Sequence, residues 1–304
     1  MVHGIINIYK EKGFTSHDVV AKLRGIIGQR KIGHTGTLDP DATGVLPVCL
    51  GKGTKLCDTL TDKSKVYQAV MLLGRVTDTQ DISGAVIKES DPASLSEEEV
   101  SACIKGFVGT YDQIPPMYSA IKVGGKKLYE LAREGKEVER SPRPVVIHNI
   151  RIMKIDLPRV QMEISCSKGT YIRTLCHDIG HALGCGGCME TLVRTQVSRF
   201  VIADSITLAQ VEEYRDAGLL DTMIIPVDAM FKDYEKVVLM KPEIDRVYNG
   251  GIFKVSEGMV PEIADQEKVR VYNDRGDFIA LYRYQEADKL FRVEKMFFNL
   301  DELS

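Results

Sequence analysis

One acidic residue lies in a loop whose composition is suited to holding it in place. Asp39 belongs to the segment Gly33–Leu56, GHTGTLDPDATGVLPVCLGKGTKL, where glycine and threonine are frequent and an apolar run follows. Pro40 restricts Asp39 to extended backbone conformations, and glycines allow tight turns and close approach by a ligand. A positioned carboxylate can act as a nucleophile or a general base. A structural turn is the more common use of an isolated Asp-Pro pair, and the dense glycines favour the functional use.

A second segment supplies groups that could work with a carboxylate. Cys166–Leu175, CSKGTYIRTL, predicts the end of a strand, a helix cap at Thr170, and a helix whose first turn carries Tyr171 and Arg173. The guanidinium fork of arginine pairs well with carboxylates and phosphates, although an ordinary surface arginine would fit the sequence too. Tyr67, in the predicted strand KVYQAV, either packs in the core or offers its ring to a nucleic-acid base.

A metal site is the alternative suggested by HDIGHALGCGGC. His177 and His181 are four residues apart on a predicted helix, and Cys185 and Cys188 form a CxxC pair. Zinc fingers place about a dozen residues between their ligand pairs, whereas three separate the histidine and cysteine pairs here. Asp178 also stands where a zinc peptidase would have glutamate. We therefore predict no metal.

The composition indicates a cytoplasmic protein large enough for one sizeable core or two smaller ones. The chain has 304 residues, a net charge of −3 and seven cysteines. An odd number of scattered cysteines is typical of reduced thiols rather than a disulfide framework, and we expect no signal peptide or membrane span. Residues 10–55 contain eight basic and four acidic residues. This local excess of basic residues is compatible with a phosphate-binding face and equally with an ordinary solvated surface.

Strands and helices must position these groups. Thr15 and Asp18 have capping-box spacing at the start of one helix, and Gly28 marks its end. The predicted elements alternate irregularly and include hairpin-like pairs, which favours an α+β fold with a mixed or antiparallel sheet. The predicted strands are 4–10, 45–50, 64–74, 145–155 and 160–167, and the predicted helices are 15–28, 94–107, 170–183 and 207–218.

Two regions stand apart from this pattern. Residues 115–143 are basic, open with two prolines and contain Gly124-Gly125, so we expect a turn within a protruding binding arm. After residue 234 the pattern changes to short strands at 267–274, 277–284 and 289–299, with a hairpin turn at NDRGD. We expect a catalytic domain over residues 1–234 and a small all-β domain over 235–304.

Four segments, taken together, resemble the TruB-type tRNA pseudouridine synthases. GHTGTLDPDATGVLPVCLGKGTKL is similar to their catalytic motif, KVYQAVMLLGRVTDTQDISG to their tyrosine motif and CSKGTYIRTLCHDIGHALG to their arginine motif. PPMYSAIKVGGKKLYELAREG resembles their RNA-gripping arm, and the tail resembles their PUA-like domain. The resemblance runs in order through about the first 230 residues. One departure is Lys10-Glu11, where the family usually has Lys-Pro.

The resemblance implies both the reaction and its residues. Uridine-55 in the T-loop of tRNA would be flipped out and isomerised to pseudouridine, without a cofactor or metal, by a monomeric enzyme that binds tRNA and no membrane. Asp39 would start the ring exchange, Tyr67 would stack on the base, and Arg173 would pair with Asp39. The implied substrate-binding residues are Lys10, Lys126 and Lys127 at phosphates, Tyr171 and Leu192 lining the pocket, and His34 in the space that the flipped nucleotides leave.

Three other functions remain open at this point. A base-excising glycosidase would need a second carboxylate beside Asp39, for which Asp41 is the nearest in sequence. A metal-dependent enzyme could combine Asp39 with Asp78 and Asp81. An RNA-binding or tRNA-folding protein would need no catalytic carboxylate. The sequence also leaves open whether Asp39 attacks the sugar, attacks the base or removes a sugar proton.

Overall fold

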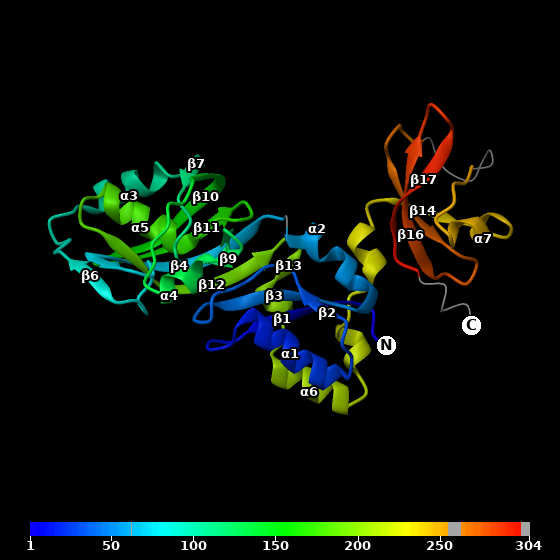
Figure 1. Ribbon diagram of the computed structural model, residues 1–304, viewed down its shortest axis with the longest axis horizontal. Helices are drawn as coiled ribbons and strands as arrows, with labels where there is room; N and C mark the ends of the chain where they lie inside the picture. The colour runs from blue at the N-terminus through cyan, green and yellow to red at the C-terminus, as the bar shows by residue number, and fades with distance from the viewer. Residues whose placement is uncertain (62, 255–262, 299–304) are drawn as a thin grey trace.

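The computed structural model describes residues 1–61, 63–254 and 263–298, and its largest feature is a nine-stranded sheet (Figure 1). Within the described residues, neighbouring strands of this sheet are antiparallel except β12 and β3, so the predicted mixed-sheet α+β fold is confirmed. The strand order is β1 (Gly4–Lys10), β3 (Thr43–Leu50), β12 (Gly187–Val197), β4 (Lys65–Leu73), β11 (Arg159–Cys166), β10 (Arg143–Asp156) and β7 (Gly109–Gln113), with β2 (Ile32–His34) on β3 and β13 (Phe200–Val201) on β12.

Helices cover the two halves of this sheet separately. α1 (Ser16–Ile27) and α6 (Leu208–Asp216) lie side by side against the β1–β3 half, where their apolar residues form one core cluster. α3 (Glu97–Lys105) and α5 (Ile172–Ala182) pack on the half containing β4, β11 and β10, and form a second cluster. The junction between the two halves is therefore β3 against β12.

Side-chain capping fixes the start of α1 as predicted, whereas α5 starts without the predicted side-chain cap. Thr15 Oγ1 accepts from the Asp18 amide at 3.1 Å, Asp18 accepts in return from the Thr15 amide at 2.8 Å, and Gly28 ends α1 with a φ of 71°. The predicted capping box and stop are confirmed. The predicted Thr170 cap of α5 is wrong, because its hydroxyl donates to the Ser167 carbonyl at 3.0 Å. Tyr171 is the residue before the helix.

β12 is the main element that the sequence pattern did not predict. It pairs with β4 over nine residue pairs and lies near the middle of the sheet. Register irregularities follow Met189 and Arg194, so buried and exposed residues do not alternate regularly along it. Bulges of this kind remove the period-two signal from which strands are predicted.

The region of the expected arm contains a short hairpin followed by a helix. Gly124 and Gly125 turn the hairpin of β8 (Lys122–Val123) and β9 (Lys126–Lys127) with φ values of 58° and 85°, as predicted. The short helix α4 (Leu128–Arg133) follows. Two small elements elsewhere are the helix α2 (Cys57–Thr61) and the hairpin of β5 (Arg75–Thr77) with β6 (Val86–Glu89).

The C-terminal sheet has four strands and its own core. Its order is β14 (Glu235–Val238), β15 (Lys268–Tyr272), β16 (Phe278–Gln285) and β17 (Leu290–Met296), with the short helix α7 (Glu243–Val247) beside it. The NDRGD turn is confirmed, because Asn273 Oδ1 accepts from the Asp277 amide at 2.8 Å. Residues 255–262 and 299–304 of the predicted domain lie outside the described residues. In the described part of the chain, no helix is long and apolar enough to cross a membrane.

Asp178 is a partly buried carboxyl on α5 whose ionisation opposes folding. Burial raises its pKa to about 6, and nearby His181 acts in the opposite direction more weakly. The native state therefore binds more protons than the unfolded state between about pH 4 and pH 6, so this group lowers stability as the pH rises through that window.

We expect Asp178→Asn to stabilise the protein at pH 7.5 by about 1–2 kcal/mol, after allowance for partial solvent screening. The gain should shrink as the pH falls and be small at about pH 4, where Asp178 is protonated in the native state and about half protonated in the unfolded state. Thermal melts of both proteins at the two pH values measure this. Asp216→Asn is the control, because Arg215 holds the pKa of Asp216 low and the change should not stabilise. A gain independent of pH would contradict the prediction.

Candidate active site

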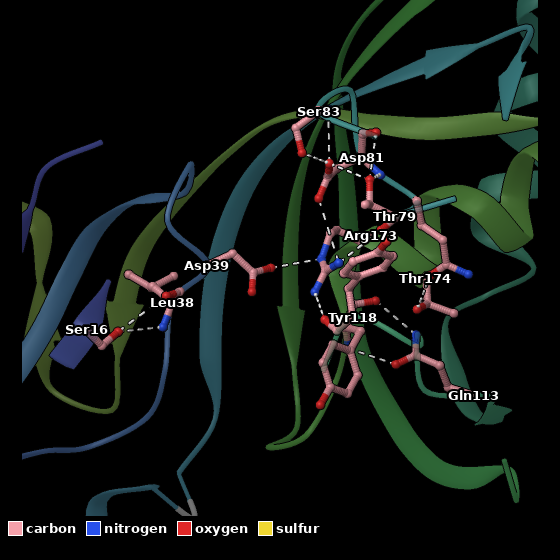
Figure 2. Close-up of polar contacts among 12 residues, drawn as sticks. Ser16, Leu38, Asp39, Thr79, Asp81, Ser83, Gln113, Tyr118, Arg173 and Thr174 are labelled. Atoms are coloured by element: carbon pink, nitrogen blue, oxygen red, sulfur yellow. Dashed lines mark hydrogen bonds and ion pairs between the residues drawn. The ribbon is translucent and has the colours of Figure 1, made fainter. Parts of the chain in front are cut away.

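A single ion pair joins the two residues that the sequence singled out for chemistry. Arg173 Nε lies 2.8 Å from Asp39 Oδ2 (Figure 2). The Arg173 side chain is 5% exposed, whereas that of Asp39 is 40% exposed. The carboxylate is thus held from the protein side by a buried cation and remains open to solvent. A nucleophile or general base for an incoming substrate needs both properties.

Backbone carbonyls fix the rest of the Arg173 guanidinium. Nη1 donates to the Thr79 carbonyl at 2.9 Å and Nη2 donates to the Tyr118 carbonyl at 3.0 Å. These acceptors come from the turn after β5 and from the start of the arm, so three separate segments meet at Arg173 (Figure 2). These two hydrogen bonds set the orientation of the planar fork, whose Nε edge faces Asp39 as an ion pair without hydrogen-bond geometry.

A second carboxylate approaches the same guanidinium. Asp81 Oδ2 lies 3.7 Å from Arg173 Nη1, and Asp81 Oδ1 accepts from Thr79 Oγ1 at 2.8 Å and from the Ser83 amide at 3.0 Å. The turn therefore directs one oxygen of Asp81 inward. Asp78 accepts from the Ala85 amide at 2.8 Å within the same turn. Among the described residues, no three or more His, Cys, Asp or Glu side chains are grouped to hold a metal.

The loop that carries Asp39 is anchored from β1 and α1. Ser16 Oγ accepts from the Leu38 amide at 2.9 Å and lies 3.3 Å from the Leu38 carbonyl, to which it donates. The Lys10 ammonium donates to the carbonyls of Pro40 at 3.1 Å and Phe14 at 2.6 Å. Lys10 is fully buried, which lowers its pKa to about 8. This position does not fit the predicted phosphate contact, because the ammonium faces the backbone of the loop.

Arg194 is a residue of this site that sequence reasoning missed. It is fully buried on β12, and its guanidinium donates to the carbonyls of Val45 at 2.8 Å, Thr37 at 3.3 Å and Gly36 at 3.3 Å. The available signal was an arginine within an otherwise largely apolar segment, two residues after Leu192. This arginine does not indicate an active-site role unless β12 is first recognised as a strand.

The predicted aromatic and apolar residues lie on neighbouring elements. Tyr67 on β4 is 7% exposed, and burial raises its pKa. Tyr67 and Leu192 belong to the same core cluster as Leu38, the residue before Asp39. Tyr171 precedes α5, and its backbone amide donates to Gln113 Oε1 at 2.8 Å.

His34 and the two arm lysines lie in different settings. His34 ends β2 and is partly buried, which lowers its pKa, and its Nδ1 accepts from the Gly36 amide at 3.3 Å. Lys126 pairs with Glu134 at 3.2 Å, and Lys127 Nζ lies 3.2 Å from the Tyr129 hydroxyl, to which it donates. Both lysines belong to the arm hairpin.

The histidines and cysteines of HDIGHALGCGGC do not form a ligand set within the described residues. His177 Nδ1 is buried without a hydrogen-bond partner, and burial lowers its pKa. Cys185 and Cys188 are both buried free thiols.

Two family models match the chain in succession. Residues 24–172 match the TruB family pseudouridylate synthase N-terminal domain, and residues 173–232 match the tRNA pseudouridylate synthase B C-terminal domain. A protein named tRNA pseudouridine synthase B from Lachnoclostridium phytofermentans is 51% identical over 97% of this chain and 100% of its own. A protein of the same name from Clostridium perfringens is 43% identical over 97% of this chain and 99% of its own.

Solved structures agree with these matches. The chain is similar, with a TM-score of 0.71 and 27% identity, to a chain of a Cbf5–Nop10–Gar1 complex, over 98% of this chain and 86% of that one. A chain of an H/ACA RNP bound to a substrate RNA containing 2′-deoxyuridine gives the same TM-score at 26% identity. The fold, together with the family models, defines a pseudouridine synthase. Within that class, the chain belongs to the TruB family.

We expect Arg173→Lys to lower kcat by at least about 10²-fold, because a lysine ammonium cannot meet Asp39 and the two carbonyls in one plane. Turnover of a tRNA substrate under saturating conditions measures this. Arg151→Lys is the control, since Arg151 pairs with Glu163 in an exposed contact at 2.9 Å. Retention of the wild-type kcat by Arg173→Lys would contradict the role of the fork.

Proposed function

We propose that this enzyme converts uridine-55 in the T-loop of tRNA to pseudouridine and that Asp39 is its catalytic carboxylate. The main support is the contact between a solvent-open Asp39 and a buried Arg173, in a chain of the TruB family. A carboxylate attacks or accepts a proton only where it is held within reach of the substrate, and the contact with Arg173 holds Asp39 in one place. The family's activity is the conversion of a tRNA uridine to pseudouridine, and the proposal adds that Asp39 reacts and that the uridine is uridine-55.

The chemistry requires no second substrate. The bond from C1′ of the ribose to N1 of uracil breaks, the base rotates, and C1′ is joined to C5, which gives up its proton while N1 acquires one. Nothing is oxidised or hydrolysed in this exchange. A carboxylate can start it by attack at C1′, by attack at C6 or by removing a sugar proton. Asp39 is the proposed reacting group on each route.

The base must leave the loop stack to reach Asp39, which costs a few kcal/mol. We assign Tyr67 as the surface on which the flipped uracil stacks, with Leu192 and Tyr171 as neighbouring walls. Burial raises the pKa of Tyr67, so its hydroxyl is a neutral donor near pH 7. Apolar walls exclude water while the glycosidic bond is broken. His34 would occupy the space that the flipped nucleotides leave.

The arm and the C-terminal sheet supply the remaining RNA contacts in this proposal. Lys126 and Lys127, on an exposed hairpin, would bind phosphates of the T-arm. Lys10 is omitted from this group because its ammonium is buried against carbonyls. The domain limits at 1–234 and 235–304, the arm at 115–143, the monomeric state and the cytoplasmic location stay predictions.

Conversion of a T-arm stem-loop, followed by nucleoside analysis with chelator present, tests the proposal. We expect pseudouridine from the wild type and none from Asp39→Asn, because the amide cannot act as nucleophile or base. Asp41→Asn is the matched control: Asp41 is exposed two residues away and should leave conversion unchanged.

Each rival function has its own outcome in this assay. Free uracil would indicate a glycosidase, and loss of activity with chelator would indicate a metal-dependent enzyme. Full conversion by Asp39→Asn would remove Asp39 from the mechanism. RNA binding with no product from the wild type would favour a binding or tRNA-folding protein.

A further inference from the structure

We infer that Arg194 is a positioning residue that holds the Asp39 loop and the Tyr67 strand in register with each other. The inference rests on the proposed function, because it assigns Arg194 a role in placing the two groups that would face the substrate base. Arg194 itself does not react. Its position on β12, between β3 and β4, allows it to contact elements on both sides.

The guanidinium holds the loop on both sides of Asp39. Its three carbonyl acceptors are Gly36 and Thr37, shortly before Asp39, and Val45, six residues after it. One rigid planar group thus ties the entry and the exit of the loop to β12. Movement of the loop away from the sheet would remove acceptors from a fully buried cation, which carries a large desolvation cost.

The same side chain lies against Tyr67. Arg194 and Tyr67 are directly opposite residues in the antiparallel pairing of β12 with β4, where neighbouring side chains on one face contact each other. Tyr67 is buried, and its phenol interacts with the Arg194 guanidinium. The position of the ring is therefore coupled to the group that holds the Asp39 loop.

The backbone of Arg194 adds a third constraint. Arg194 pairs with Gly44 where β12 runs parallel to β3. A Cβ atom on Gly44 would come within 2.2 Å of the Arg194 carbonyl oxygen, and Gly44 has a φ of 107°. The loop end and β12 therefore approach more closely than any other residue at position 44 would allow. The side chain and the backbone of Arg194 therefore both hold the Asp39 loop against β12.

Among the described residues, the printed partners of this cation are carbonyl oxygens and a phenol rather than a carboxylate. An arginine that served only to stabilise the sheet could be replaced by an apolar residue, often without loss. At this position the hydrogen bonds instead converge on the two segments that carry Asp39 and Tyr67. A displacement of the reacting groups by about 1 Å can lower the rate about 10²-fold. Loss of the Arg194 hydrogen bonds should therefore lower the rate of the chemical step more than the affinity for RNA.

The test is single-turnover conversion of the T-arm stem-loop with enzyme in excess. At saturating enzyme, the rate constant reports the chemistry of folded enzyme and is insensitive to a partly unfolded population. We expect Arg194→Lys, which keeps the charge and loses the fork, to lower this constant about 10²-fold. The enzyme concentration that gives half the maximal rate should change less than about threefold, because the Arg194 side chain is fully buried within the protein.

Two control variants separate positioning from stability. Val20→Ala removes a buried side chain from the α1 cluster and should lower the melting temperature without changing the saturating rate constant. Arg159→Lys alters an exposed arginine bound to Glu190 on β12 and should be neutral. Arg194→Gln, measured beside Arg194→Lys, provides a second variant should one of them not fold.

The outcomes are distinct. A wild-type rate constant in either folded Arg194 variant would overturn the inference, as would a defect that appears only as an increase in the half-saturating enzyme concentration. Absence of pseudouridine from the wild type would instead overturn the proposed function.

Discussion

A guanidinium removed from water needs a counter-charge and hydrogen-bond acceptors around it, and the site depends on this constraint. Arg173 is almost fully buried and is bound by Asp39 and by carbonyls of two other segments. Withdrawal of any one partner would leave part of a buried charge without an acceptor. The turn after β5, the beginning of the arm and the Asp39 loop are therefore held together by one side chain.

Local interactions were the part of the fold that the sequence could predict. The Thr15–Asp18 capping box and the Gly124-Gly125 turn involve neighbours in the chain, so residue type and spacing are sufficient to predict them. The motifs around Asp39 and Arg173 were recognised for a different reason. The contact between Asp39 and Arg173 is implied only by the resemblance to a family, because two segments separated by more than a hundred residues carry no local signal that they touch.

Burial of charge was the part that the sequence could not predict. Lys10 and Arg194 look like surface residues by type, yet both are fully buried against backbone carbonyls. Carbonyl acceptors belong to every residue, so no sequence pattern marks which of them will meet a cation. β12 was missed because its bulges interrupt alternation, and the Thr170 cap failed because the hydroxyl bonds to the preceding turn.

The place of β12 between β3 and β4 also has a consequence for synthesis of the protein. Both of its neighbours in the sheet are made more than a hundred residues earlier, and within the described residues β3 and β4 reach each other through β12. Contacts between such distant segments form late. A nascent chain therefore lacks a joined sheet until Gly187–Val197 has left the ribosome, so the enzyme would not acquire its active geometry before its catalytic region is essentially complete.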